Sequence, residues 1–380
     1  MTRKKIVTYL LIILTLLMIA DIKYVRSDNN IFEGFITESI EEMIGMENNF
    51  FQNDFNQESI KAEKDGSLKL GSDFLNENQE ISNFILENDF GSIELQGSQS
   101  EEININYTLK VHAEEKEAAE KFIQDLEIIY NIKGEDLEIS LNKSQTETPE
   151  LINVVEIAYQ ITIPEKMQTK LTNKYGELKV QNLKAEVNAA NRYGSTQIND
   201  IDKAVVLELA YGESAIYNLK SSLDLDSSYA ENTIKNIAGR FNLESAYGFN
   251  KITNLESKLQ MKSRYGGAEI SSTANIDLDS RYTGFEISEV KGKLKADSEY
   301  GDLRLSQIED LDLELRYVDT AISMIGDYEL YNYDLKAEYG NIEAAFAKED
   351  YEDQQELKYQ GQRAEYEIKI NSEYGDINIK

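Results

Sequence analysis

Apolar residues in the second half of the chain return at a regular interval of 18 residues, shortened twice to 17. One apolar column is unbroken and runs Val180, Ile198, Ile216, Ile234, Ile252, Ile270, Ile287, Leu305 and Ile322. Seven positions further on, apolar residues two apart alternate with polar ones, as in Val187/Ala189 and Leu223/Leu225. This alternation is the period of a half-buried strand rather than of a helix. Each interval therefore predicts short strands that present one apolar face.

Tyrosine marks the same interval, five residues before each member of the unbroken apolar column. The tyrosine column consists of Tyr175, Tyr193, Tyr211, Tyr229, Tyr247, Tyr265, Tyr282, Tyr300 and Tyr317. A repeat this short and regular indicates stacked coils. We therefore expect an all-β fold: a parallel β-helix, or β-solenoid, with about 18 residues per coil.

Two residue types are typical of the corners of such coils. Glycine follows most of the tyrosines, and we expect it to adopt a positive φ at the first corner. Asparagine marks a second corner, where stacked amides can hydrogen-bond along the axis, at Asn182, Asn218, Asn236 and Asn254. We interpret the tyrosine column as structural, with binding of sugar rings or of a partner as the alternative.

The chain begins with a basic and then apolar stretch. Three basic residues, Arg3 to Lys5, precede an apolar run from Ile6 to Ala20. This predicts a signal peptide over residues 1–27, or an uncleaved N-terminal anchor, and an extracytoplasmic location. The chain contains no cysteine, which excludes a disulfide framework and lipid modification at cysteine.

The remainder divides by the presence of the repeat. Residues 28–80 lack it and are expected to form a leader that is partly helical or loosely ordered. The β-solenoid is expected over 81–380, with its regular coils at 175–340. Helical spacing predicts an inserted helix over 113–130, and the long interval after Tyr339 predicts a loop insertion at about 347–364.

Composition limits the partners and the chemistry. Acidic residues outnumber basic ones 70 to 39, for a formal net charge of −31, which disfavours nucleic acid and anionic lipid headgroups. We expect membrane contact only through the N-terminal segment, if that segment is not cleaved. His112 is the sole histidine, so nucleophile–base pairs and zinc sites cannot be assembled. We assign no catalytic, cofactor-binding or metal-binding residue, and carboxylate chemistry is the enzymatic possibility that is left.

The Tyr-Gly-x-hydrophobic coils, the signal sequence and the helical insertion resemble a bacterial family of adhesins with β-strand repeats. This family is related to the auto-transporter adhesin head, or GIN domain, and the resemblance covers roughly residues 81–380. It implies a right-handed parallel β-helix in the cell envelope, with no established catalytic residues.

These observations favour a non-enzymatic, secreted or envelope-anchored adhesin-like module that binds a surface glycan, matrix or protein. Two alternatives stay open. The residues Ile377 to Lys380 start a fresh coil, and an uncapped parallel edge there would permit end-to-end self-association into a scaffold. A carbohydrate-active β-helix enzyme would instead need carboxylates that converge on one face.

Overall fold

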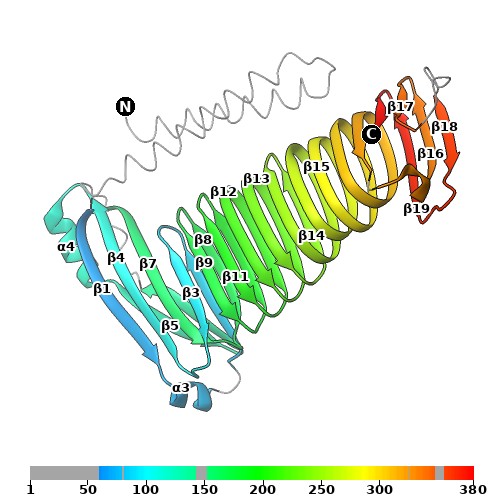
Figure 1. Ribbon diagram of the computed structural model, residues 1–380. Coiled ribbons are helices and arrows are strands. Elements are labelled where there is room, and N and C mark those ends of the chain that lie inside the picture. The colour runs from blue at the N-terminus through cyan, green and yellow to red at the C-terminus, as the bar shows by residue number, and fades with distance from the viewer. Residues whose placement is uncertain (1–59, 79–80, 143–151, 325, 347–354) are drawn as a thin grey trace. The chain divides into compact units, whose positions relative to one another are not determined.

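The computed structural model describes residues 60–78, 81–142, 152–324, 326–346 and 355–380 (Figure 1). The chain divides into a unit before Lys61 and a unit from Lys61 to Lys380, and the fold below is that of the second unit. The expected signal segment and most of the leader lie outside the described residues. Among the described residues, no helix combines the length and the apolar character that crossing a membrane requires.

The regular part of the chain is a parallel β-solenoid, as the repeat predicted. Its strands are β8 (Gln168–Lys174), β9 (Leu178–Leu183), β10 (Val187–Arg192), β11 (Thr196–Ile201), β12 (Val205–Leu219), β13 (Leu223–Ile237), β14 (Phe241–Ala246) and β15 (Phe249–Ser323). Each coil contributes a segment to two facing ladders, as β10 and β11 do. The β15 element continues through several coils in Figure 1.

Every position of a coil lies beside its own equivalent in the next coil. In one ladder Val187 pairs with Val205, which pairs with Leu223. In the other, Ile198 pairs with Ile216 and then with Ile234. The apolar columns read from the sequence are thereby buried and form one continuous core between the ladders. Burial of these side chains supplies the main stabilising term, because apolar area leaves water in every coil.

The corner geometry corrects the role expected for glycine. The tyrosine itself adopts the positive φ, between 53° and 60° along the column, and the glycine after it does not. Glycine is needed for space instead: a Cβ at Gly194 would lie 1.9 Å from the carbonyl oxygen of Gly176 in the coil below. A positive φ costs a side-chain-bearing residue about 1–2 kcal/mol, which the contacts of the tyrosine must offset.

The N-terminal end of the solenoid carries a mixed cap. Its elements are β1 (Ile60–Leu70), α3 (Ser72–Glu77), β2 (Asn83–Asn88), β3 (Ile93–Ser98), β4 (Ile103–Ala113), α4 (Lys116–Gln124), β5 (Glu127–Lys133), β6 (Asp136–Asn142) and β7 (Ile152–Pro164). β2 and β3 form a coil that pairs with β8 and β9. On its other side the ladders continue into β6 and β7, which antiparallel β5 and β4 then cover.

Two boundaries in this cap differ from those expected. The helix is shorter than the 113–130 predicted, because residues from Glu127 onward pair with β6 as a strand. The end of the leader is also ordered, since Ile60–Leu70 forms β1 and pairs with β4. β1 is held by pairing with a strand distant in sequence, and β5 by a hairpin with β6, the next strand along the chain. The helical spacing of residues 113–130 did not show that hairpin.

At the C-terminal end, spatial order departs from chain order. The elements are η2 (Tyr328–Leu330), β16 (Tyr331–Glu338), β17 (Ile342–Ala344), β18 (Glu356–Gln360), β19 (Tyr366–Glu373) and β20 (Ile377–Ile379). β19 lies between β15 and β16, and β20 lies between β15 and β17. The final coil is therefore an internal layer. The expectation of an uncapped coil at Ile377 to Lys380 is wrong.

The predicted loop insertion at about 347–364 is also partly structured. Within it, β18 pairs antiparallel with β16 and covers the outer edge of that strand (Figure 1), while residues 347–354 lie outside the described residues. The outermost layer is formed by β16 and β17, and the edge of β16 is closed by an antiparallel strand.

The positions directly after the tyrosines form a column occupied mostly by glycine, and substitutions in this column test how closely neighbouring coils are packed. Residues with a side chain do occupy this column, at Ala230, Thr283 and Val318, and glycine lies on both sides of each. Gly301 lies between Thr283 and Val318, so Gly301→Ala would place three side chains in successive coils. We expect it to lower the free energy of unfolding by about 1–3 kcal/mol, the usual cost of overpacking.

Gly194→Ala should cost at least as much as Gly301→Ala, because its Cβ would lie 1.9 Å from the carbonyl oxygen of Gly176, compared with 2.2 Å between a Cβ at Gly301 and the carbonyl oxygen of Thr283. Gly284→Ala is the matched control, since its Cβ would meet no atom within 4 Å. Chemical denaturation of the three variants measures the order. Equal losses at Gly301 and Gly284 would contradict the packing account.

Candidate functional site

The tyrosine column forms a continuous stack of aromatic rings along one corner of the solenoid. Consecutive ring centroids lie 4.7–5.1 Å apart, and the ring planes differ by 1–10°. Among the described residues the stack contains, in spatial order, Phe90, Tyr175, Tyr193, Tyr211, Tyr229, Tyr247, Tyr265, Tyr282, Tyr300, Tyr317, Tyr374 and Tyr339. At about 4.8 Å per layer, the spacing of hydrogen-bonded strands, this tyrosine ladder extends on the order of 50 Å.

The ladder is a surface feature whose ring edges, rather than ring faces, meet solvent. Tyr193, Tyr247 and Tyr300 are 38–39% exposed, and Tyr339 at the outer end reaches 64%. Because each internal ring is covered on both faces by its neighbours, a sugar cannot stack on it as on an isolated aromatic platform. The ladder therefore offers a ligand ring edges and a row of phenol groups at the spacing of the strands.

Buried amides and hydroxyls support the ladder from inside the corner. Asn88 donates to Asn173 at 3.0 Å, and Asn173 donates to Asn191 at 3.3 Å. Further along the axis, Asn232 accepts from Ser214 at 2.7 Å and donates to Asn250 at 2.8 Å. These hydrogen bonds satisfy polar groups that burial would otherwise make costly, and they hold neighbouring corners in register.

The second corner carries an exposed amide ladder at the asparagine positions singled out from the sequence. Asn254 donates to Asn236 at 2.6 Å, Asn236 to Asn218 at 2.8 Å, and Asn218 to Asp200 at 3.1 Å. Asn182 belongs to the same column, and all of these residues adopt a φ between 56° and 63°. Asparagine tolerates this region better than most residues do, so the column serves the corner geometry.

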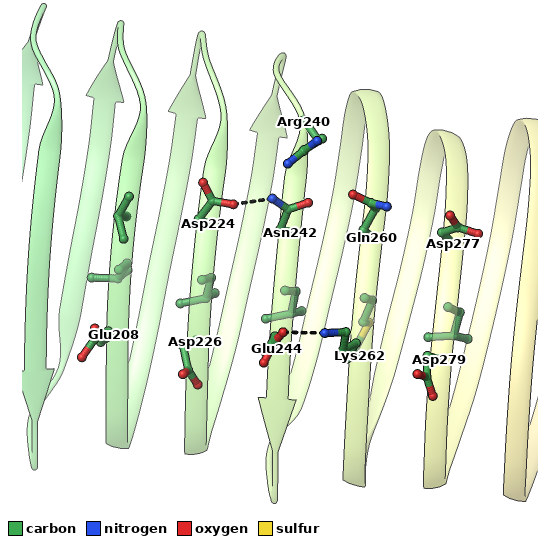
Figure 2. Close-up of a pocket in the computed structure, with 16 residues that line it drawn as sticks. Glu208, Asp224, Asp226, Arg240, Asn242, Glu244, Gln260, Lys262, Asp277 and Asp279 are labelled. Atoms are coloured by element: carbon green, nitrogen blue, oxygen red, sulfur yellow. Dashed lines mark hydrogen bonds and ion pairs between the residues drawn. The ribbon is translucent and has the colours of Figure 1, made fainter.

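The outward face of the strand ladder that contains β12, β13 and β14 forms a shallow acidic concavity of about 650 Å³. Figure 2 shows its side chains in rows, one from each coil, rather than converging on a single point. Glu208, Asp226 and Glu244 occupy one row in direct register, followed by Lys262. Lys262 lies 2.8 Å from Glu244, while Asp224 accepts a hydrogen bond from Asn242 in the neighbouring row.

The central carboxylate of this row is electrostatically strained. Partial loss of water, together with the charges of Glu244 and Glu208, raises the pKa of Asp226 above its ordinary value. Like charges directly beside one another in adjacent strands oppose ionisation. A raised carboxyl pKa is one property of general acids, so Asp226 is a candidate for carboxylate chemistry.

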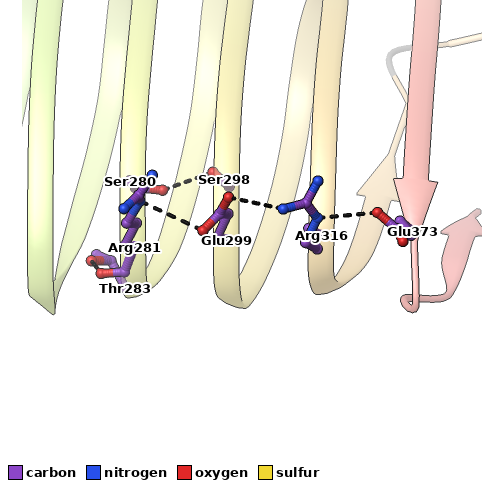
Figure 3. A network of polar contacts seen from close by, with 7 residues as sticks. All are labelled: Ser280, Arg281, Thr283, Ser298, Glu299, Arg316 and Glu373. Atoms are coloured by element: carbon purple, nitrogen blue, oxygen red, sulfur yellow. Dashed lines mark hydrogen bonds and ion pairs between the residues drawn. The ribbon is translucent and has the colours of Figure 1, made fainter. Parts of the chain in front are cut away.

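Arginines and glutamates directly before the tyrosines form a row of ion pairs beside the tyrosine ladder (Figure 3). Glu299 lies 3.5 Å from Arg281 and 3.4 Å from Arg316, and Arg316 lies 3.1 Å from Glu373. All four side chains are at least partly exposed, so each pair contributes little alone, about 0–1 kcal/mol. The row does join the inserted β19 to the regular coils through Glu373.

The sole histidine is buried in the N-terminal cap, where it contacts a carboxylate. His112 belongs to β4, pairs with Val154 of β7 and is 2% exposed, with its Nε2 atom 3.3 Å from the carboxylate of Glu156. Its hydrogen bond is the main cause that lowers the pKa of Glu156. Within the part of the chain that the structure describes, no group of three or more His, Cys, Asp or Glu residues is arranged to hold a metal ion.

Comparison with known proteins identifies a family. The sequence model described as Toastrack DUF4097 matches residues 81–380, about four fifths of the chain. No curated protein matches the chain. Among solved structures, the chain is similar to a "putative cell adhesion protein" from Clostridium sporogenes at 15% identity, with a TM-score of 0.21. That match covers 84% of this chain and 99% of the other.

The acidic row generates a prediction about stability and pH. Since the folded-state pKa of Asp226 is raised, ionising this group in the fold is unfavourable at neutral pH, and the penalty disappears as pH falls below its ordinary pKa. Asp226→Asn should therefore raise the melting temperature slightly at pH 7, and the gain should vanish near pH 3. Thermal unfolding from pH 3 to 8 measures this. Asp297→Asn, at an exposed position, is the control, and a gain independent of pH would contradict the electrostatic cause.

Proposed function

The chain belongs to the Toastrack DUF4097 family, and from its fold and surface we propose that it is a non-enzymatic, adhesin-like binding rod that acts outside the cytoplasm. Its ligand is a surface glycan, a matrix component or a protein on the cell or in its surroundings. The observation that carries this proposal is the tyrosine ladder, an exposed and periodic line of phenol groups along the rod.

Stacking of the rings in the tyrosine ladder does not require their hydroxyl groups. Phe90 occupies the first rung and stacks on Tyr175 at 5.1 Å with planes 10° apart, much as the tyrosines stack on one another. Phenylalanine therefore satisfies the stacking geometry, yet tyrosine occupies the other rungs. A phenol adds a group that donates and accepts hydrogen bonds at each layer.

Recognition would rely on many weak and equivalent contacts. An extended polymer lying parallel to the axis meets one phenol for every strand layer, and hydroxyl-rich sugars or peptide amides suit such contacts. Each hydrogen bond contributes about 0.5–1.5 kcal/mol, and linking them along one polymer multiplies their effect. The negative net charge of the chain disfavours anionic polymers, so neutral or basic ligands fit best.

The extracytoplasmic location is supported by sequence features. The basic and apolar pattern of residues 1–27 has the form of a signal segment. The acidic composition suits a chain that must remain soluble outside the cytoplasm.

Carbohydrate cleavage is the second candidate function, favoured by the raised pKa of Asp226 in the acidic concavity. The non-enzymatic function is preferred because the carboxylates lie in rows along the rod instead of facing one another across a cleft (Figure 2). Turnover in a polysaccharide depolymerisation screen, abolished by Asp226→Asn, would establish the enzymatic function in its place.

The binding role of the ladder can be tested without disturbing the stack. The triple variant Tyr247→Phe, Tyr265→Phe, Tyr282→Phe removes three central hydroxyls and keeps all the rings. We expect its apparent affinity for the best ligand on glycan and matrix arrays to fall about tenfold or more, given about 0.5–1.5 kcal/mol for each hydrogen bond. Thermal unfolding of the same variant measures how much of any loss of affinity comes from a loss of stability.

Tyr130→Phe is the matched control, because Tyr130 is 42% exposed in β5, outside the ladder. Its binding should be unchanged. Equal binding by the triple variant and the original chain would exclude the ladder as the binding surface, and a lack of retention on every array would count against the adhesin-like function.

A further inference from the structure

The C-terminal layers are ordered in a way that separates one peptide from the rest of the fold. After Ser323 the chain passes over one layer, builds the outermost coil from β16 and β17, and returns to fill the omitted layer with β19 and β20. The ring order shows the same insertion, because Tyr374 lies between Tyr317 and Tyr339. We call residues 366–379 the insert and the layer they fill the slot.

The slot binds the insert on both edges and in its core. Parallel partners flank the insert on each side, and its four isoleucines, Ile368, Ile370, Ile377 and Ile379, are at most 2% exposed. These side chains continue the apolar columns of the solenoid. Because these four isoleucines are almost fully buried, an empty slot would leave a large apolar surface in water.

Carboxylates also hold the backbone of the insert at both of its strands. The amide of Glu367 donates to Asp310 at 2.8 Å, and the amide of Asp376 donates to Asp319 at 3.0 Å. Asn371 donates its side-chain amide to Glu314 at 2.8 Å. Hydrogen bonds to ionised acceptors are stronger than neutral ones, and Arg316 adds the ion pair with Glu373 (Figure 3). The slot thus recognises an extended peptide of defined register.

The insert reaches the slot through a short surface connection from β18. Residues 361–365 are largely exposed and are tied down mainly through Glu329. The amide of Gln362 donates to the carboxylate of Glu329 at 2.7 Å, and the amide of Arg363 donates to its carbonyl oxygen at 3.1 Å. Release of this connection would free the residues that lead into the insert from their contacts with Glu329.

From this arrangement we propose that the slot is a peptide-binding site that also accepts the insert of a second copy of the chain. Every contact of the insert is reproduced when a second copy supplies it, so exchange costs chiefly the entropy of association and the rearrangement of residues 361–365. Reciprocal exchange closes a twofold dimer through the C-terminal layers of the two solenoids. Because each chain is acidic, moderate salt should favour exchange by screening repulsion.

The absence of native cysteine permits a direct test with the full chain. Asp334 and Lys369 are paired in register between β16 and β19, and both are exposed. Their Cα separation in paired strands suits a disulfide. A copy carrying Asp334→Cys is mixed with a copy carrying Lys369→Cys under native, mildly oxidising conditions, and the products are resolved by non-reducing electrophoresis.

Exchange predicts a disulfide-linked heterodimer whose yield rises with protein concentration and exceeds the control mixture at least tenfold. The control mixture combines Asn188→Cys with Val206→Cys, an exposed pair in register between β10 and β12, whose coils cannot exchange alone. The double variant Asp334→Cys, Lys369→Cys should close its disulfide within one chain, which shows that the variant folds with the insert in place.

Two results would overturn the proposal. One is intramolecular closure of the double variant without any heterodimer above the control, which would show a slot that never exchanges. The other is failure of the double variant to close while the solenoid is folded by circular dichroism, which would show that the insert does not occupy the slot. Neither result bears on ligand binding by the tyrosine ladder.

Discussion

Parallel pairing in register is the constraint on which the rest of this molecule depends. Because each coil lies directly on the next, every side chain has its own equivalent as a neighbour at the strand spacing of about 4.8 Å. Residues that contact copies of themselves well are therefore favoured in every column. Isoleucine does so in the core, tyrosine by ring stacking at the first corner, and asparagine by amide hydrogen bonds at the second.

The same constraint penalises columns of like charge. Glu208, Asp226 and Glu244 are neighbours in one row, and the pKa of Asp226 is raised by its partial burial and by the two neighbouring charges. Elsewhere acids and bases alternate, as in the row from Arg281 through Glu299 and Arg316 to Glu373. A chain with so large an acidic excess must place part of that excess in such rows, and the concavity of Figure 2 is one place where the structure does so.

The corners show how a local cost is met by a longer-range gain. Tyrosine with a positive φ is unfavourable in isolation, and the compensation comes from rings stacked on both sides and from buried amides behind them. The adjoining glycine lets the backbones approach, and a larger residue is accommodated where glycine lies above and below it. The ends of the solenoid are handled differently, by antiparallel strands that cover parallel edges.

The sequence alone determined the solenoid, its coil length and the core columns, because a period of 18 residues is a local property that one coil repeats to the next. It also identified the tyrosine and asparagine corners, although it assigned the positive φ to glycine, since φ and the approach of a neighbouring coil cannot be read from residue type. Features that depend on pairing between distant strands were decided only by the tertiary structure. It made β1 and β18 strands, placed the coil of β2 and β3 beside residues about 85 positions away, and put the final coil inside the stack. Coils with the same residue pattern can occupy any layer of the solenoid. Their order in space therefore depends on the loops that connect them and on the strands that pair with the edges, and neither can be read from the 18-residue period.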